Sequence, residues 1–409
     1  MNINKKILYI TYDGMTDPLG QSQVLPYLVG LSKEGYRFTI LSFEKKERYE
    51  RFKDIINRIT KAAGITWVPL SFTTKPPLVS KYYDSVRMKR TAFRLHRQQR
   101  FDMIHCRSYI AADLGLRLKR NTGVKFLFDM RGFWADEKKD AGTWNQNSFL
   151  FRKVYQYYKQ KENEFIREAD YIISLTHAGK GEIMNWPSYN PAVPMSVIPC
   201  CADMDHFTLT SVEDRKKGRI RLGLPEKGLV VSYLGSLGAW YMLDEMLELF
   251  AVIKKKYTEA KFLFITHSSP QLILSRLPIF HLSSDDILIK EASRQEVPVF
   301  AKASDVSISF IKAMYSKLSS SPTKLGELLA MGIPVIVNAG VGDVEAIVSD
   351  SGGGVVMYGF TAEHYRETVD AIAGLMQKEP QSIRANITKV YSLEEGVKQY
   401  SDAYKVILG

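Results

Sequence analysis

The sequence predicts an α/β protein with two doubly wound domains, each a parallel sheet covered by helices on both faces. Three observations lead to this prediction. Short apolar, strand-like segments alternate with amphipathic helical segments along nearly the whole chain. The alternation restarts after residue 228. At 409 residues, the chain is also long enough for two domains of ordinary size.

The predicted strands are short continuous apolar runs, as expected for parallel strands that are buried on both faces. They cover residues 7–12, 38–43, 66–70, 102–106, 125–130, 171–176, 195–199, 229–235, 261–267, 286–290, 305–310, 334–338 and 353–357. We expect an N-terminal domain at 1–200 and a C-terminal domain at 201–389. Residues 200–228 are polar and basic and suit a linker, and a helix near 390–409 is expected to pack back on the first domain.

Charge is unevenly divided between the two halves. The net charge of +12 comes from the first half, because residues 1–200 carry +14 and residues 201–409 carry −2. A basic half suggests an anionic partner, such as a membrane surface or a phosphorylated substrate. Residues 81–100, if helical, either form a solvated face or bind anionic lipid. Their basic face would carry Arg87, Arg90, Arg94 and Arg97. With no helix-turn-helix or base-stacking module, we expect no nucleic-acid partner.

Cysteine content and hydropathy indicate a cytoplasmic protein. The three cysteines cannot form a disulfide framework, and none lies in a metal-binding CxxC pair. The N-terminal apolar run is too short for a signal peptide, and no stretch reaches the ~18 apolar residues of a membrane span. We therefore expect a cytoplasmic protein, peripheral on the inner face of the membrane if the basic helix binds lipid.

Residues 319–337, SSSPTKLGELLAMGIPVIV, predict a helix that leads into a buried strand. A Ser or Thr cap, with Pro322 in the first turn, would leave backbone N–H groups exposed at the start of the helix. Lys324 suits a phosphate, and Glu327 could accept hydrogen bonds from two ribose hydroxyls or simply pair with Lys324. Together these residues are typical of a nucleotide site, because phosphate and anions bind at helix N-termini.

Further candidate residues follow predicted strands, where parallel sheets bind ligands. Gly235 and Ser236 allow a close approach to phosphate, and the proposed donor side comprises Gly235, Ser236, Ser319, Ser321, Pro322, Thr323, Lys324 and Glu327. In the first domain, the candidates on the acceptor side are Gly20, Gln21, Asp129 and Arg131. A GxGxxG fingerprint is missing, so a nicotinamide cofactor is not expected. The carboxylates do not have the spacing of a metal site, so neither a metal nor a cofactor is predicted.

Several of these segments together resemble the retaining family 4 glycosyltransferases, of bacterial surface-polysaccharide type. They are FDMRGFWADE, VIPCCADMDHF, YLGSLGAWYMLDEML, SPTKLGELLAMGIPVIV and AGVGDVEAIV, in this order along almost the whole chain. The resemblance implies the GT-B fold, with two Rossmann-like domains facing across a cleft. It also implies a nucleotide-sugar donor on the second domain, a glycan or lipid-linked acceptor on the first, and metal-independent transfer with retained configuration. Lys324, Glu327 and Arg131 would be the catalytic residues.

The sequence departs from the family pattern at three places. Ser319 stands where many members have the first glutamate of an E-x7-E motif, and Glu327 matches the second. The segment GSLGAWYMLDE lacks the Arg and Lys that many members carry there, and Arg131 stands where His is frequent. Two alternatives stay open: a nucleotide-sugar 2-epimerase of similar architecture, and a non-catalytic nucleotide-sugar-binding protein.

Overall fold

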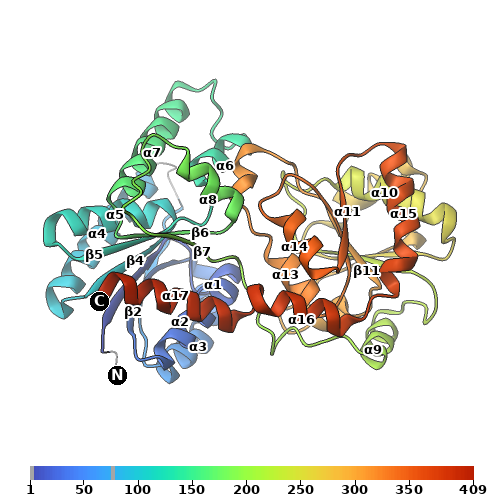
Figure 1. Ribbon diagram of the computed structural model, residues 1–409, viewed down its shortest axis with the longest axis horizontal. Coiled ribbons are helices and arrows are strands. Elements are labelled where there is room, and N and C mark those ends of the chain that lie inside the picture. Colours follow the sequence, from blue (N-terminus) through green and yellow to red (C-terminus); the bar gives the residue numbers. More distant parts are fainter. Residues whose placement is uncertain (1–3, 75–78) are drawn as a thin grey trace. The chain divides into compact units, whose positions relative to one another are not determined.

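The computed structural model describes residues 4–74 and 79–409 and contains two compact units. One unit consists of Met1–Pro199 together with Leu393–Gly409, and the other of Cys200–Ser392. Each unit is built on one sheet whose strands are all parallel (Figure 1). The prediction of an α/β protein with two doubly wound sheets is confirmed.

The first unit has a seven-stranded sheet in the order β3-β2-β1-β4-β5-β6-β7. Its strands are β1 (Lys6–Thr11), β2 (Arg37–Glu44), β3 (Thr66–Ser71), β4 (Met103–Arg107), β5 (Lys125–Asp129), β6 (Tyr171–Ser174) and β7 (Met195–Val197). Continuous apolar runs made these strands predictable, since β1, β2, β4, β5 and β6 are buried along almost their whole length.

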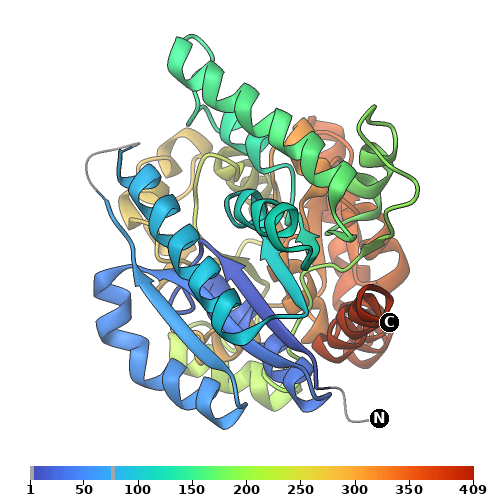
Figure 2. The same ribbon diagram turned by 90° about the vertical axis from the view of Figure 1, so that its left-hand side faces the viewer.

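Helices lie on both sides of the first sheet, as Figure 2 shows with this unit turned toward the viewer. They are α1 (Pro18–Gln23), α2 (Leu25–Lys33), α3 (Lys46–Ala62), α4 (Val79–Gln99), α5 (Ser108–Thr122), α6 (Trp134–Asp140), α7 (Phe149–Glu168), α8 (His177–Met184) and the C-terminal α17 (Leu393–Leu408). α17 packs directly on α2. The two backbones approach closely because Gly30 of α2 has no Cβ, and one placed there would lie 2.6 Å from Val397 Cγ2.

The second unit has a six-stranded sheet in the order β10-β9-β8-β11-β12-β13. Its strands are β8 (Val230–Leu234), β9 (Lys261–Ile265), β10 (Ile287–Lys290), β11 (Val306–Ser309), β12 (Val335–Asn338) and β13 (Gly354–Met357). Its α-helices are α9 (Val212–Leu222), α10 (Leu243–Lys256), α11 (Pro270–Leu274), α12 (Val297–Ala301), α13 (Thr323–Ala330), α14 (Val344–Ser351), α15 (Ala362–Met376) and α16 (Pro380–Tyr391), and its 3-10 helices are η1 (Leu277–Phe280), η2 (Ser284–Asp286) and η3 (Tyr315–Ser319).

Two apolar cores stabilise the second unit, one on each face of its sheet. One contains buried side chains of α13, α14 and α16, and the other contains those of α10 and α15. Strand β8 contributes Val230 to the first core and Val231 to the second, as its alternating side chains require.

Residues 200–228 are not a linker, so this prediction is wrong. They begin the second unit and contain α9, which packs on α12. A full capping box between Ser211 and Asp214 starts this helix. Its Arg219 is buried and donates to Asp305 Oδ2 over 2.6 Å. Polar composition suggested a linker because much of the charge on α9 lies on its solvent face.

None of the helices within residues 4–74 and 79–409 is long and apolar enough to cross a membrane.

Candidate functional site

Both sheets place their candidate residues at the point where the strand order reverses. This reversal lies between β1 and β4 in the first unit and between β8 and β11 in the second. Ligands of open α/β sheets bind beyond the carboxyl ends of strands at such points. The loops that follow β1, β8 and β11 lie at these points and carry most of the residues singled out from the sequence, and the loop that follows β5, with Arg131, lies one strand further along the sheet.

In the second unit, Gly235 lies directly against Lys324. Gly235 follows β8 with a φ of +132°, which residues other than glycine rarely adopt. A Cβ placed on it would lie 2.3 Å from Lys324 Nζ. The loop after β8 and the first turn of α13 are therefore in contact through the lysine ammonium. The absent side chain leaves the space that this ammonium occupies.

Two lysines lie over the aromatic residues of the loop after β8. Lys324 Nζ lies 5.4 Å from the ring centroid of Tyr241, and Lys317 Nζ lies 3.8 Å from that of Trp240. Both distances suit cation–π attraction. The loop itself lacks the basic residues that many family 4 members have, and the segment 315–324 brings two lysines to it. Lys317 and Trp240 were not among the site residues predicted from the sequence.

The start of α13 differs from the expected capped turn. Pro322 is the N-cap residue rather than part of the first turn, and no side chain caps the helix. Ser321 is not a cap, because its Oγ accepts a hydrogen bond from the Cys200 N–H over 3.1 Å. Helix geometry leaves the N–H groups of Thr323 and Lys324 without intrahelical acceptors. An anion could therefore bind at this terminus, but through backbone N–H groups and Lys324, not through a serine cap.

Ser319 and Ser236 occupy structural positions beside this terminus. Ser319 ends η3, is buried, and donates to Ser316 O over 3.2 Å. The carbonyl of Ser236 accepts from the Tyr233 hydroxyl over 2.9 Å, which fixes the turn after β8.

Glu327 lies one turn further along α13 and is buried, with 8% of its surface exposed. Burial raises the pKa of this carboxyl to about 7, although the charges of Arg294 and Lys324 oppose the rise. Arg294 follows β10, and its guanidinium lies 5.9 Å from the ring centroid of Phe207. Arg294 was not among the site residues predicted from the sequence. Its position just beyond the predicted strand at 286–290 could have indicated it, because parallel sheets bind ligands beyond the ends of their strands.

In the first unit, Gly20 and Gln21 stabilise the loop after β1. A Cβ on Gly20 would lie 2.1 Å from Gly14 O, so only glycine fits there. The Gln21 side chain donates to Thr16 O over 3.0 Å. The buried carboxylate of Glu44 accepts from the N–H groups of Met15 and Thr16, over 2.8 and 3.1 Å. These contacts fix the course of the loop.

Asp129 ends β5 beside two arginines and a histidine. Its Oδ1 lies 3.8 Å from Arg131 Nη1, and its Oδ2 lies 4.0 Å from Arg107 Nη1 and 3.3 Å from His105 Nε2. Burial alone would raise the pKa of Asp129. Arg131, His105 and Arg107 outweigh this effect, so the pKa is lowered and Asp129 is ionised at neutral pH. Arg131 has a left-handed backbone, with φ of +54°, held beside this carboxylate.

The carboxylates of segment 129–137 belong to separate clusters. Asp136 accepts from the Tyr155 hydroxyl over 2.7 Å and pairs with Lys159 over 2.9 Å, apart from the contacts of Asp129. Among the side chains that the structure describes, no three His, Cys, Asp or Glu residues are grouped as metal ligands.

Residues 23–206 match the family model described as Glycosyltransferase Family 4. The match covers most of the first unit, including β4, β5 and the cluster around Asp129. No curated protein matches the sequence.

Solved structures of glycosyltransferases share the fold over nearly the whole chain. Sucrose-phosphate synthase from Thermosynechococcus elongatus aligns with a TM-score of 0.70 at 13% identity, covering 98% of each chain. HepE of Anabaena, in complex with UDP and glucose, aligns at 0.69 and 13%, covering 98% of this chain and 99% of that one. WaaG, a glycosyltransferase involved in lipopolysaccharide biosynthesis, aligns at 0.69 and 13%, covering 98% and 100%. The fold is GT-B.

Proposed function

We propose that the protein transfers a sugar from a nucleotide-diphosphate-sugar donor to a hydroxyl of a glycan or lipid-linked acceptor, with retained configuration, in surface-polysaccharide biosynthesis. The observation that carries this proposal is the contact of Lys324 with Gly235 beyond β8, with Glu327 one turn further along α13. A cation at a helix N-terminus suits a diphosphate, and a buried carboxylate nearby suits ribose hydroxyls. The UDP and glucose bound to HepE, a protein of the same fold, support a nucleotide-sugar donor.

In the proposed sugar transfer, negative charge develops on the leaving diphosphate and must be stabilised. The bond between the anomeric carbon and the diphosphate oxygen breaks, which leaves negative charge on the diphosphate. Lys324 and the N–H groups at the start of α13 would stabilise this charge as it develops. The acceptor oxygen bonds to the anomeric carbon on the face that the diphosphate leaves, and the acceptor proton passes to a diphosphate oxygen. Arg131 and Asp129 of the first unit would position the reacting sugar or the acceptor.

A thermal-shift screen of nucleotide sugars, followed by product analysis, tests the proposal. The true donor should raise Tm, because a ligand that binds only the folded state stabilises it by mass action. The product should carry the sugar in the donor's anomeric configuration. Stabilisation without hydrolysis or transfer would instead identify a non-catalytic binding protein. An intact nucleotide sugar with changed C2 configuration would identify an epimerase.

We also propose that transfer does not require a metal ion. Lys324 and the α13 N–H groups supply positive charge at the expected diphosphate position. Activity should therefore be unchanged by EDTA, measured as nucleoside diphosphate release before and after exhaustive chelation. Loss of activity that Mg²⁺ or Mn²⁺ restores would contradict this assignment of the diphosphate site.

We propose that helix α4 binds the surface of an anionic membrane, and its exposed arginines are the observation that supports this. Arg90, Arg94 and Arg97 are exposed on it, while Met88 and Leu95 face the core. One expectation for this helix needs correction. Arg87 is only partly exposed, because it donates to Ser71 O over 2.9 Å and lies 3.9 Å from Asp84. Tyr82 of the same helix is 74% exposed.

Replacing Arg90, Arg94 and Arg97 together with Gln should weaken binding to phosphatidylglycerol vesicles by about 10²-fold at low salt. Each basic residue near an anionic surface contributes about 1 kcal/mol. Binding should also weaken as salt rises, since the Debye length is about 8 Å at physiological ionic strength. Co-sedimentation across a salt series measures both effects.

The matched control replaces three exposed lysines of the second unit, Lys217, Lys255 and Lys378, with Gln. It should bind vesicles like the wild type. Equal binding by the α4 variant and the wild type would show that this face of α4 is only solvated.

A further inference from the structure

The C-terminal helix contributes two tyrosine hydroxyls to the polar cluster at the carboxyl ends of β4 and β5. Tyr400 donates to Asp129 Oδ2 over 3.0 Å, across 271 residues of sequence. The Tyr404 hydroxyl lies 2.7 Å from His105 Nδ1. All four side chains are buried, so these hydrogen bonds are shielded from water.

The protonation states in this cluster follow from its partners. Burial lowers the pKa of His105, although Asp129 opposes the effect, so the imidazole is neutral at pH 7. A carboxylate only accepts hydrogen bonds, so His105 Nε2 carries the proton and donates to Asp129. Its Nδ1 then accepts from Tyr404. Asp129 Oδ2 therefore receives two donors, one from His105 and one from Tyr400.

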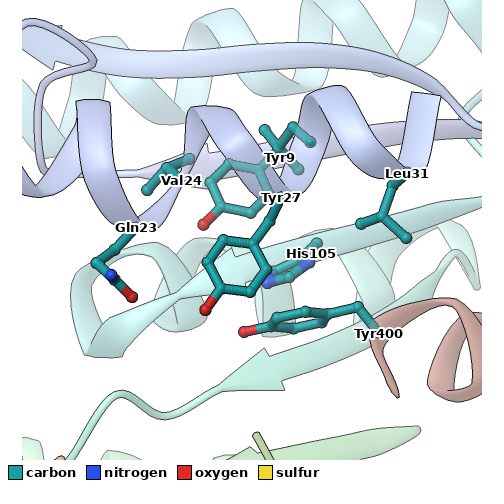
Figure 3. A pocket seen from close by; sticks show the side chains of 8 residues that line it. Tyr9, Gln23, Val24, Tyr27, Leu31, His105 and Tyr400 are labelled. Carbon is teal, nitrogen blue, oxygen red and sulfur yellow. The ribbon is translucent and has the colours of Figure 1, made fainter. Parts of the chain in front are cut away.

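A small cavity lies beside Tyr400 (Figure 3). Its volume is about 10 Å³, which is room for about one water molecule. In Figure 3, the hydroxyls of Tyr27 and Tyr400 and the amide of Gln23 lie toward one side of it, and Leu31 toward the other. The Tyr27 and Tyr400 rings pack edge to face, 5.5 Å apart. The Tyr400 ring is therefore held by packing, and removal of its hydroxyl alone leaves that packing in place.

Four neighbouring segments contribute charged or titratable groups around Asp129. Strand β4 contributes His105 and Arg107, the turn after β5 contributes Arg131, β1 contributes Tyr9, and α17 contributes Tyr400 and Tyr404. Asp13, in the loop after β1, lies 3.7 Å from Arg107 Nε. Asp129 is the buried anion shared by Arg107, Arg131 and His105. The orientation of its carboxylate therefore affects the placement of both arginines.

We propose that Tyr400 is a positioning residue for the first unit's substrate site, because it holds the Asp129 carboxylate and, through it, the guanidinium of Arg131. This inference rests on the proposed function, in which Arg131 contacts the reacting sugar or the acceptor. The C-terminal helix then supports the substrate site through the hydrogen bond of Tyr400 to Asp129.

The test compares Tyr400→Phe with the wild type in two measurements. The first is the pH dependence of kcat/KM with the donor found by the screen. The hydroxyl stabilises the ionised carboxylate, so its loss should raise the pH at which Asp129 protonates. The acid limb of this pH profile should move upward by about one to two pH units. The free energy of a hydrogen bond to a charged group corresponds to a pKa shift of about this size. The second measurement is Tm from about pH 2 to pH 8, a range that includes the pH values below 3.8 at which Asp129 protonates in the folded wild type. Because the folded-state pKa of Asp129 is lowered, its stabilisation disappears as pH falls, and in the variant it should disappear at higher pH.

Tyr36→Phe is the matched control. The Tyr36 hydroxyl donates to Ser401 O, 3.4 Å away on the same helix, and is not in contact with Asp129. This variant should keep the wild-type pH dependence in both measurements. An unchanged acid limb in an active Tyr400→Phe variant would overturn the inference, even if Tm fell. A wild type without turnover on any donor would instead refute the proposed function, and the pH dependence of Tm would still test the pairing of Tyr400 with Asp129.

Discussion

Lys324→Met is expected to lower the turnover of the nucleotide sugar by about 10²–10³-fold, the usual cost of removing one preorganised group that stabilises developing negative charge. The variant should stay folded, because methionine is flexible and can fill the space beside Gly235 and the Tyr241 ring. Release of nucleoside diphosphate measures turnover, and a melting curve verifies folding.

Lys324→Arg should not restore activity. The lysine Nζ already occupies the space that a Cβ on Gly235 would need, so the larger guanidinium does not fit without movement of the loop. Lys378→Met removes an exposed lysine of the same unit and should behave like the wild type. Full turnover by Lys324→Met would remove Lys324 from the diphosphate site.

Glu327→Gln should have two effects of opposite sign. It should weaken nucleotide binding by about 10- to 100-fold, since a hydrogen bond to a charged group contributes about 1.5–3 kcal/mol. It should also make the unliganded protein more stable at pH 8. Burial raises the pKa of Glu327 from 4.5 to about 7, so the folded state loses stability as pH rises from about 4.5 to about 7 and stays less stable above that range.

The size of the stability effect follows from the pKa. A rise of about 2.5 corresponds to about 3 kcal/mol at pH 8, and the effect should vanish below about pH 4, where the carboxyl is neutral in both the folded and the unfolded state. Calorimetry of nucleotide binding at pH 8 and melting curves at about pH 4 and pH 8 measure the two effects. Glu363→Gln, which changes an exposed carboxylate of α15, should alter neither. Unchanged nucleotide affinity in folded Glu327→Gln would exclude Glu327 from the site.

Sequence patterns predicted the parts of the fold that depend on local residue order. Buried parallel strands need continuous apolar runs, so each run, from Lys6–Thr11 to Gly354–Met357, was visible in the sequence. Lys324 and Glu327 were also visible, because helix N-termini after strands are where such sheets bind anions. The error at 200–228 arose because a helix with one narrow buried face has almost the composition of a linker.

Contacts between distant segments could not be predicted from local patterns. Nothing near Tyr400 indicates that it binds Asp129, because the pairing depends on how α17 packs on α2. The cation–π pair of Lys317 and Trp240 likewise depends on the course of two loops. Nor does the sequence show that Ser321 accepts from the Cys200 N–H, so its hydroxyl looked available for capping.

The last helix of the chain completes the first unit, and this affects how the protein is made. Domains that lie at the start of a chain generally fold while the ribosome is still synthesising the rest. Here the nascent first unit lacks α17, so neither the α2–α17 packing nor the hydrogen bond from Tyr400 to Asp129 can form until α17 has been synthesised. A nascent chain can therefore finish its second unit before its first, and a chain truncated after Ser392 would contain every strand of both sheets and still lack a complete first unit.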